Sequence, residues 1–301
     1  MTLLDLSDCW RRETGAFLAV GHVDHDLRGA ASRADADFVR RQCAARGLPV
    51  AVIKAPVQKW AKAHGRGIED AARTLRYGAL AQAARRFRCA AVATGHSLND
   101  QVETVFLHLI RGAGPAGLAG MASDSDWPVS VPGRAPRLLR PLLNVSRGRI
   151  LAHLRRRKRP CRKDASNDDA AFLRNRLRPV LNAWEKLRPG FFSRVAQTAR
   201  LLRDEEDYWR RRLSPLRTVG SRRNWAPLRL DIPSFLRYSV VEQRRRLRHL
   251  FGLTRFESVE RVRAFAAARA RGPLDLPGAR VKKAGLRLLF LRGSRVTKGT
   301  L

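Results

Sequence analysis

The sequence predicts an α/β protein: a doubly wound parallel sheet, followed by a helical domain and a short C-terminal β-like segment. In the first half, short apolar stretches alternate with amphipathic helical patterns, as in βαβ units. Beyond about Trp184 long helical patterns take over, and near Leu274 short strand patterns return. We therefore predict a nucleotide-binding domain over residues 1–183, a helical domain over 184–272 and a β-like segment over 273–301.

The elements of the first half follow from the spacing of apolar residues. A run of four to seven apolar residues predicts a buried strand, and apolar residues three or four apart predict a helix. Glycine after a helical pattern marks its end. In chain order the predicted elements are a strand at Phe17–Val23, a helix at Arg33–Arg46, a strand at Pro49–Lys54, a helix at Ile68–Arg86, a strand at Ala90–Ala93 and a helix at Asp100–Arg111.

The next part begins with a stretch rich in glycine, proline, serine and aspartate, which predicts a long and functional surface loop at Gly112–Arg137. A helix is expected from Ser146, with serine as its cap, up to the basic residues before Pro160. Three longer helices and a set of short strands follow. They are expected at 191–212, 240–251 and 258–269, and at 274–291 with turns at Pro277-Gly278 and Gly285.

Composition points to a polyanionic partner. Lysine and arginine number 61 against 26 acids, a formal charge of +35, which suits nucleic acid or an acidic membrane surface. Coding bias in a GC-rich genome explains the preference for arginine over lysine, but not the shortage of acids.

The four cysteines are widely spaced, so neither a zinc knuckle nor a disulfide framework is indicated. Without a spanning apolar run or a signal-peptide pattern, we expect a soluble, cytoplasmic protein that does not contact a membrane.

Polar and titratable residues follow two of the predicted strands. His22 and Asp24 close the first strand, and His96 follows the strand at Ala90–Ala93. The carboxyl ends of parallel strands line the ligand crevice of such a sheet, so these side chains are placed to meet a ligand. Asp100 and Glu103 share a face of the next helix's first turn. Histidines at a strand end are also typical of a hydrogen-bonded turn.

Arginines form two further groups. Arg73 and Arg76 lie one turn apart on a predicted helix, where they could grip phosphate or simply face solvent. Between Arg155 and Lys163 seven of nine residues are basic. A basic helix end is usually only a solvated surface, because cations complement a helix C-terminus, but with an RNA substrate it would position the sugar–phosphate backbone.

These motifs, in this order and spacing, resemble the tRNA(Ile)-lysidine synthetases of the PP-loop ATP pyrophosphatase superfamily. The resemblance spans nearly the whole chain. It is carried by His22-Val23-Asp24-His25, Ile68-Glu69 with Ala72-Arg73 and Arg76-Tyr77, Thr94-Gly95-His96 with Asp100-Gln101 and Glu103-Thr104, Arg111-Gly112 with Gly117 to Met121, Arg140-Pro141-Leu142, and Arg174-Asn175-Arg176-Leu177-Arg178.

The resemblance implies a reaction. ATP adenylates the C2 oxygen of the wobble cytidine (position 34) of tRNA(Ile) with a CAU anticodon, pyrophosphate leaves, and free L-lysine displaces AMP to form lysidine. ATP and Mg²⁺ would be required, and the sequence leaves a homodimer open. The implied residues are Asp100, Glu103 and Arg76 for catalysis, with Asp100 also for Mg²⁺; His22, Asp24, His96 and Arg73 for the nucleotide; and Arg140, Arg155, Arg156, Arg157, Arg174 and Arg178 for tRNA. Asn99 replaces an aspartate of many relatives and receives no charge-dependent role.

One part of the family pattern is missing. The printed sequence holds no Ser-Gly-Gly-x-Asp-Ser loop, whose backbone N–H groups would cradle pyrophosphate, and Met1–Leu6 resembles the helix start that follows that loop. We expect the loop to be encoded upstream in frame. Two alternatives stay open: a catalytically inactive RNA-binding protein, and a tRNA sulfur-transfer enzyme of the same superfamily. Sulfur-transfer enzymes that carry iron–sulfur clusters need closely spaced cysteines, which this sequence lacks.

Overall fold

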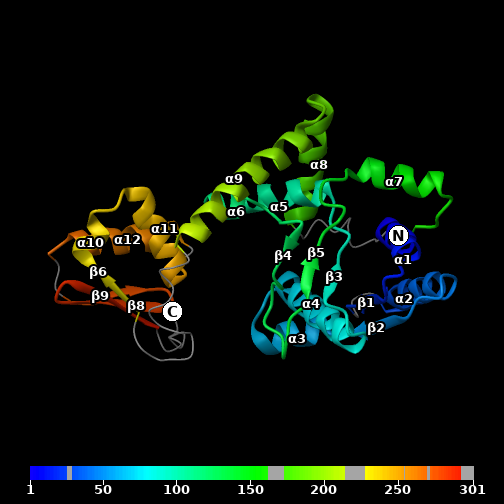
Figure 1. Cartoon of the computed structure of the whole chain (residues 1–301), viewed down its shortest axis with the longest axis horizontal. Coiled ribbons are helices and arrows are strands. Elements are labelled where there is room, and N and C mark those ends of the chain that lie inside the picture. Colours follow the sequence, from blue (N-terminus) through cyan, green and yellow to red (C-terminus); the bar gives the residue numbers. More distant parts are fainter. Residues whose placement is uncertain (26–28, 162–172, 214–227, 254, 270–271, 293–301) are drawn as a thin grey trace. The chain divides into compact units, whose positions relative to one another are not determined.

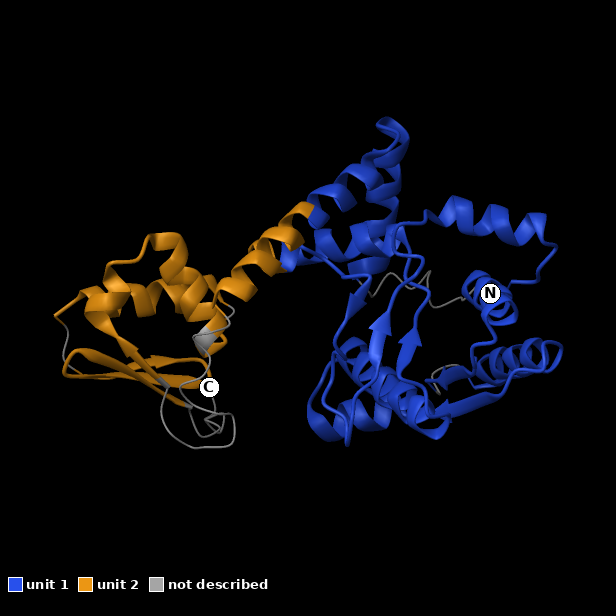
Figure 2. Cartoon of the chain, viewed as in Figure 1, with its two compact units in different colours: residues 1–113, 117–200 blue, residues 114–116, 201–301 orange. Residues whose placement is uncertain are grey.

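The structure is a computed structural model that describes residues 1–25, 29–161, 173–213, 228–253, 255–269 and 272–292. The chain divides into two compact units, coloured separately in Figure 2: residues 1–113 with 117–200, and residues 114–116 with 201–301. The boundary at residue 200 lies inside one long helix. The three-part division at residues 183 and 272 stays a prediction.

The strands of the first unit form two parallel pairs (Figure 1). Strand β1 (Val20–Asp24) pairs with β2 (Val50–Lys54), with Val20 opposite Val50. Strand β3 (Ala91–Ala93) pairs with β5 (Arg137–Leu139), and the two-residue β4 (Asp124–Ser125) adds to β5 in antiparallel direction. The predicted α/β class is confirmed. The parallel strands are interrupted between the two pairs, and β4 was not expected.

The helices of the first part of the chain follow the predicted order. Helix α4 packs against both β1 and β3, so it joins the two parallel pairs. Its observed bounds are those expected from the apolar pattern, whereas the short helices α3 and α6 and the longer α8 were not expected. The helices are α1 (Thr2–Thr14), α2 (Ala30–Ala44), α3 (Val57–His64), α4 (Ile68–Arg86), α5 (Leu98–Ile110), α6 (Pro115–Leu118), α7 (Arg147–Arg156), α8 (Leu173–Leu187) and α9 (Phe191–Leu213).

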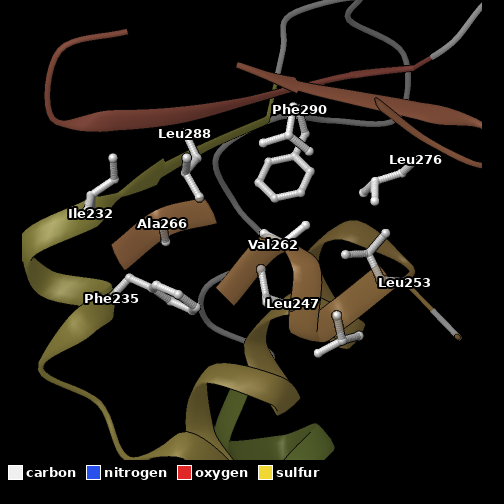
Figure 3. Close-up of a cluster of buried hydrophobic side chains, with 11 residues drawn as sticks. Ile232, Phe235, Leu247, Leu253, Val262, Ala266, Leu276, Leu288 and Phe290 are labelled. Atoms are coloured by element: carbon white, nitrogen blue, oxygen red, sulfur yellow. The ribbon is translucent and has the colours of Figure 1, made fainter. Parts of the chain in front are cut away.

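The second unit combines helices, including the C-terminal part of α9, with an antiparallel sheet of order β6-β9-β8-β7. Its core, shown in Figure 3, is built from side chains of both the helices and the strands; Phe235, Leu247 and Leu288 are fully buried. The strands expected over 274–291 are confirmed, but β6 was not predicted. The elements are β6 (Leu228–Asp231), α10 (Ile232–Leu236), α11 (Val240–Phe251), α12 (Phe256–Ala267), β7 (Leu274–Leu276), β8 (Ala279–Ala284) and β9 (Arg287–Arg292).

The turns of this sheet lie where the sequence placed them. Gly278 joins β7 to β8 and Gly285 joins β8 to β9, and both have positive φ angles of 78° and 57°. Glycine adopts this backbone conformation without the steric cost that a Cβ atom brings. None of the helices in the described ranges combines the length and apolar content needed to cross a membrane.

Candidate active site

The site lies at the carboxyl ends of β3 and β5. Thr94 directly follows β3, and its backbone N–H donates to the carbonyl of Leu139 at 2.9 Å. The hydroxyl of Thr94 is hydrogen-bonded to Nδ1 of His96 at 2.9 Å. Because β3 and β5 are parallel, His96 and Arg140 emerge at the same edge of the strand pair. This edge is where open α/β sheets bind ligands.

Helix α5 begins at this edge with a capping box. The backbone N–H and the hydroxyl of Ser97 donate to Oδ2 of Asp100 at 2.9 and 2.7 Å, and the N–H of Asp100 donates back to the hydroxyl at 3.4 Å. This cap starts the helix at Leu98, two residues before the predicted start. It also fixes the direction of the Asp100 carboxylate.

The capping box changes the acidity of Asp100. Burial raises the pKa of this carboxyl, but the hydrogen bonds from Ser97 and the charge of Arg174 outweigh burial and lower the pKa below its usual value. Nη2 of Arg174 donates to Oδ1 of Asp100 at 3.3 Å. Asp100 is therefore an anion at neutral pH, with about a quarter of its side chain, 27%, exposed.

Glu103 is buried under two arginines of α8. Nε of Arg178 donates to Oε1 of Glu103 at 2.7 Å, and Nε of Arg174 donates to Oε2. The side chain of Glu103 is 6% exposed. Arg174 thus bridges both acids of α5, and Glu103 joins α5 to α8. A small apolar cluster that includes Val102 and Leu181 packs the same two helices together.

The charges around His96 hold the imidazole neutral. Burial lowers the pKa of His96 to about 4; the positive charges of Arg140, Arg76 and Arg174 act in the same direction, and Asp100 opposes them. These electrostatic contacts bring together five residues that the sequence analysis had assigned to three different roles. The site therefore combines three arginines, one carboxylate and one neutral histidine.

Two of the predicted arginines lie in contrasting environments. Arg140, assigned to tRNA, is only 6% exposed, and its Nη1 donates to the carbonyl of Ala122 at 2.7 Å and to the hydroxyl of Ser125 at 3.0 Å. Arg73 is exposed on α4 and its guanidinium lies 5.1 Å from the ring centre of the buried Tyr77. Their binding roles stay predictions, but Arg140 is buried next to the end of β5 rather than on an open surface.

His22 and Asp24 belong to the other strand pair. Asp24 is buried, and its carbonyl accepts a hydrogen bond of 2.7 Å from the N–H of Ala55. Burial lowers the pKa of His22, and its charged neighbours are Asp24, Asp35 and Arg40. Over the described residues, the contacts found for His22 do not reach the group around Asp100. The structure brings His22 and Asp24 together, on a different strand pair from the one that His96 follows.

The basic run after α7 is partly neutralised by a residue that the sequence analysis did not single out. Asp5 of α1 is buried, and its carboxylate accepts from Nε of Arg159 at 2.8 Å and lies 2.9 Å from Nε2 of His153. Nε of Arg157 is 4.0 Å from the same carboxylate. Arg155 and Arg156 are exposed, and no ion pair is found for either within the described ranges.

Three neighbouring residues make contacts that the sequence analysis did not predict. Asn99 accepts a hydrogen bond of 2.9 Å from the N–H of Arg147, so it caps α7 rather than carrying charge. Gln101 holds the backbone of Met121 by two hydrogen bonds, of 2.8 and 3.1 Å. Ser97 could have been found from the Ser-x-x-Asp spacing of a capping box. The partners of Asn99 and Gln101 are 20 or more residues away and leave no local pattern.

The described residues do not form a dedicated magnesium site. No group of three or more histidine, cysteine or acidic side chains that could hold a metal occurs among them. One oxygen of Asp100 already accepts two hydrogen bonds from Ser97, and the other faces Arg174. Asp100 as a Mg²⁺ ligand stays a prediction, and we derive no step through a metal.

Comparison with known proteins identifies relatives of this architecture. A family model described as a PP-loop domain matches residues 1–184. The chain is 34% identical over 283 residues to the tRNA(Ile)-lysidine synthase of Solibacter usitatus, covering 89% of this chain and 60% of that protein. It is 40% identical over 190 residues to the tRNA(Ile)-lysidine synthase of Geobacter sulfurreducens, covering 63% of this chain and 39% of that protein. It therefore spans 60% or less of the length of these curated relatives.

A solved structure shares the fold. The U34-tRNA thiolase NcsA from Methanococcus maripaludis, solved with its [4Fe-4S] cluster, superposes with a TM-score of 0.55 at 16% sequence identity. The match covers 67% of this chain and 68% of that one. At this identity the likeness concerns the fold alone.

Proposed function

Since the chain belongs to the PP-loop domain family, we propose that it uses ATP to activate the wobble cytidine of tRNA(Ile) and joins lysine to it. The C2 oxygen of cytidine attacks the α-phosphate of ATP and releases pyrophosphate. The ε-amine of lysine, after losing a proton, then attacks C2; the new C–N bond replaces the C–O bond, and AMP leaves. The formal charge of +35 supports a polyanionic substrate.

One observation carries this proposal. Two motifs of the resemblance that are about seventy residues apart in the chain meet in one ion-pair network. Arg174 and Arg178 of α8 contact Asp100 and Glu103 of α5. A charged, partly buried network at the ligand edge of a parallel sheet is more than a solvated helix face requires, because burying charges costs free energy.

The geometry supports different tasks for the two acids. The side chain of Asp100 is 27% exposed and interacts electrostatically with Arg76, so Asp100 is the better candidate to attract the lysine ammonium. Glu103 is nearly covered by two guanidinium groups and is better suited to position Arg174 and Arg178. These arginines and Arg76 can face the negative charge of the adenylated intermediate.

ATP–pyrophosphate exchange tests the activation step. The full-length protein is incubated with ATP, labelled pyrophosphate and a tRNA(Ile) transcript carrying a CAU anticodon. We expect exchange that depends on the tRNA, because the base is the acceptor of AMP. An inactive RNA-binding protein would bind the transcript and show no exchange, and that result would overturn the proposal.

The chemical nature of the product distinguishes lysine transfer from the sulfur-transfer alternative. A thiolase would also adenylate tRNA and would pass the exchange test, but its product retains sulfur in place of lysine. We expect the nucleoside released from the modified tRNA to carry the mass of lysine and no sulfur. A thionucleoside would replace our proposal with the sulfur-transfer alternative.

A further inference from the structure

Arg140 is a buried cation without an acidic partner among the described residues. Arg140 is only 6% exposed. Its Nη1 donates two hydrogen bonds, both to neutral groups: the carbonyl of Ala122 and the hydroxyl of Ser125. Its Nε is fully buried and has no acceptor within the described part of the chain. Buried charges are normally paired, so this guanidinium is poised for an anion.

The position of Arg140 places it at the ligand edge of the strand pair. It directly follows β5, whose last residue, Leu139, is hydrogen-bonded through its carbonyl to Thr94 after β3. His96 and Arg140 therefore lie at the carboxyl ends of neighbouring parallel strands. Ligands of open α/β sheets bind at this edge.

The surroundings of Arg140 favour a negative ligand. Arg76 and Arg174 are cationic neighbours of the same imidazole, and His96 itself is neutral. The acid of this group is Asp100, whose oxygens are already engaged by Ser97 and Arg174. No carboxylate among the described residues therefore neutralises the guanidinium of Arg140.

We propose that Arg140 binds a phosphate group of the nucleotide at this edge of the strand pair, through the orphaned Nε side of its guanidinium. The proposal rests on the proposed use of ATP and departs from the tRNA role that the resemblance implied. A guanidinium offers a planar pair of donors to phosphate. A backbone phosphate of a folded RNA stays at the protein surface, whereas the phosphate of a small nucleotide is small enough to approach a residue that is 6% exposed.

The same arginine also anchors the loop that contains β4. Its Nη1 bonds to Ala122 and Ser125 and its backbone N–H donates to the carbonyl of Ser123 at 2.7 Å. A loss of binding in an Arg140 variant must therefore be separated from a loss of this loop. Arg137 offers a matched control, because it is exposed and anchors the same loop through Asp124 and Asp126.

The test measures binding rather than turnover. Arg140→Gln and Arg140→Lys are compared with the unchanged full-length protein by calorimetric titration with AMP, pyrophosphate and inorganic phosphate, and separately by filter binding of the tRNA transcript. We expect Arg140→Gln to weaken AMP or pyrophosphate binding at least about tenfold, the size of one charge-assisted hydrogen bond. Arg140→Lys keeps the positive charge but loses the planar pair of donors, so its affinity for AMP and pyrophosphate should lie between those of Arg140→Gln and the unchanged protein.

The controls decide between phosphate binding and loop anchoring. Arg137→Gln should leave the affinity for AMP and pyrophosphate within about twofold of the unchanged protein, and Arg140→Gln should do the same for tRNA affinity. Equal loss in Arg137→Gln and Arg140→Gln would overturn the proposal, because it would assign the effect to the loop. The proposal would also be overturned if Arg140→Gln lost affinity for tRNA but kept its affinity for AMP and pyrophosphate. If Arg140→Gln does not fold, Arg140→Lys takes its place in this comparison.

The outcome is separable from the proposed reaction. If lysine transfer is absent but pyrophosphate binding depends on Arg140, the proposed function fails and the phosphate site stands. If lysine transfer occurs and phosphate binding does not depend on Arg140, the proposed function stands and the phosphate site fails.

Discussion

At the residue scale, Glu103 illustrates how a predicted ligand can be a structural partner. The sequence placed it beside Asp100 on one helix face, and the structure confirms that face. It also adds Arg174 and Arg178, whose contacts to Glu103 bridge more than 70 positions. No local pattern could reveal that pairing, because it depends on how α8 packs on α5.

We expect Glu103→Gln to destabilise the protein by about 3 kcal/mol. The change keeps the shape but removes the carboxylate that Arg174 and Arg178 both contact, and breaking a buried pair costs about 3–5 kcal/mol. We take the lower end because Arg174 and Arg178 are 29% and 22% exposed. Urea unfolding measures the difference. Glu69→Gln, an exposed acid in the first turn of α4, is the control and should change stability by less than about 0.5 kcal/mol; a similar effect in both variants would contradict this role of Glu103.

His96 makes a prediction about acid stability. Its pKa is about 4 in the folded protein and 6.5 when unfolded, so the unfolded chain binds the proton first. Folding stability is therefore unaffected by His96 above pH 6.5 and falls as the pH drops from 6.5 towards 4. The slope is at most about 1.4 kcal/mol per pH unit.

Urea unfolding at pH 7.5 and pH 5 checks this prediction. His96→Asn removes the titrating group, so this variant should lose about 1–2 kcal/mol less than the unchanged protein over that interval. His64→Asn, an exposed histidine of α3, is the control and should follow the unchanged protein. Identical pH dependence in all three proteins would show that His96 is not held neutral by the fold.

At the element scale, the boundaries that could be predicted are those set by local signals. Helices α4 and α11 were predicted with their observed ends. Helix α11 begins with a Ser239–Glu242 capping box and ends at Gly252, which has a φ of 68°. Helix α5 was predicted two residues late because apolar spacing, rather than the Ser97 cap, defined its start. Caps record helix ends more directly than the apolar pattern does.

The elements that were missed depend on distant partners. Strand β6 has four residues and pairs with β9, about sixty residues later, with Leu228 opposite Phe290. Strand β4 has two residues and exists because it pairs with β5. Such short strands carry too few residues for a periodic pattern, and tertiary pairing decides them.

The end of α7 carries a prediction about tRNA binding. Arg155 and Arg156 are exposed in its last turns, and no ion pair is found for them over the described residues. If they bind phosphates, Arg155→Gln with Arg156→Gln should weaken tRNA binding. The slope of log affinity against log salt should also fall by about 0.7–0.9 for each phosphate that the protein no longer neutralises.

Filter binding over a range of salt concentrations measures both effects. Arg40→Gln with Arg137→Gln removes the same charge from exposed arginines that are already ion-paired, and serves as the control. This control should keep the original salt slope. Equal changes in the two double variants would contradict a specific role for the end of α7, because net charge alone would then explain the loss.

At the scale of the whole molecule, the sequence predicted the α/β class, the basic character and the family likeness. It did not reveal that the parallel strands form two separate pairs, or that the second unit is a mixed helix and sheet structure. Figure 2 shows that the unit boundary falls within α9, where no change in composition marks it. Contacts between distant segments define both features, and spacing along the chain does not record them.

The transfer of lysine to tRNA tests the proposed function most directly. The full-length protein is incubated with ATP, labelled lysine and tRNA(Ile) transcripts that carry cytidine or guanosine at the wobble position, and the digested nucleosides are identified by mass. We expect one lysine per cytidine transcript, at that base, with release of AMP and pyrophosphate, and no label in the guanosine transcript. Absence of lysine from the cytidine transcript, with the protein folded and the tRNA bound, would contradict the proposal.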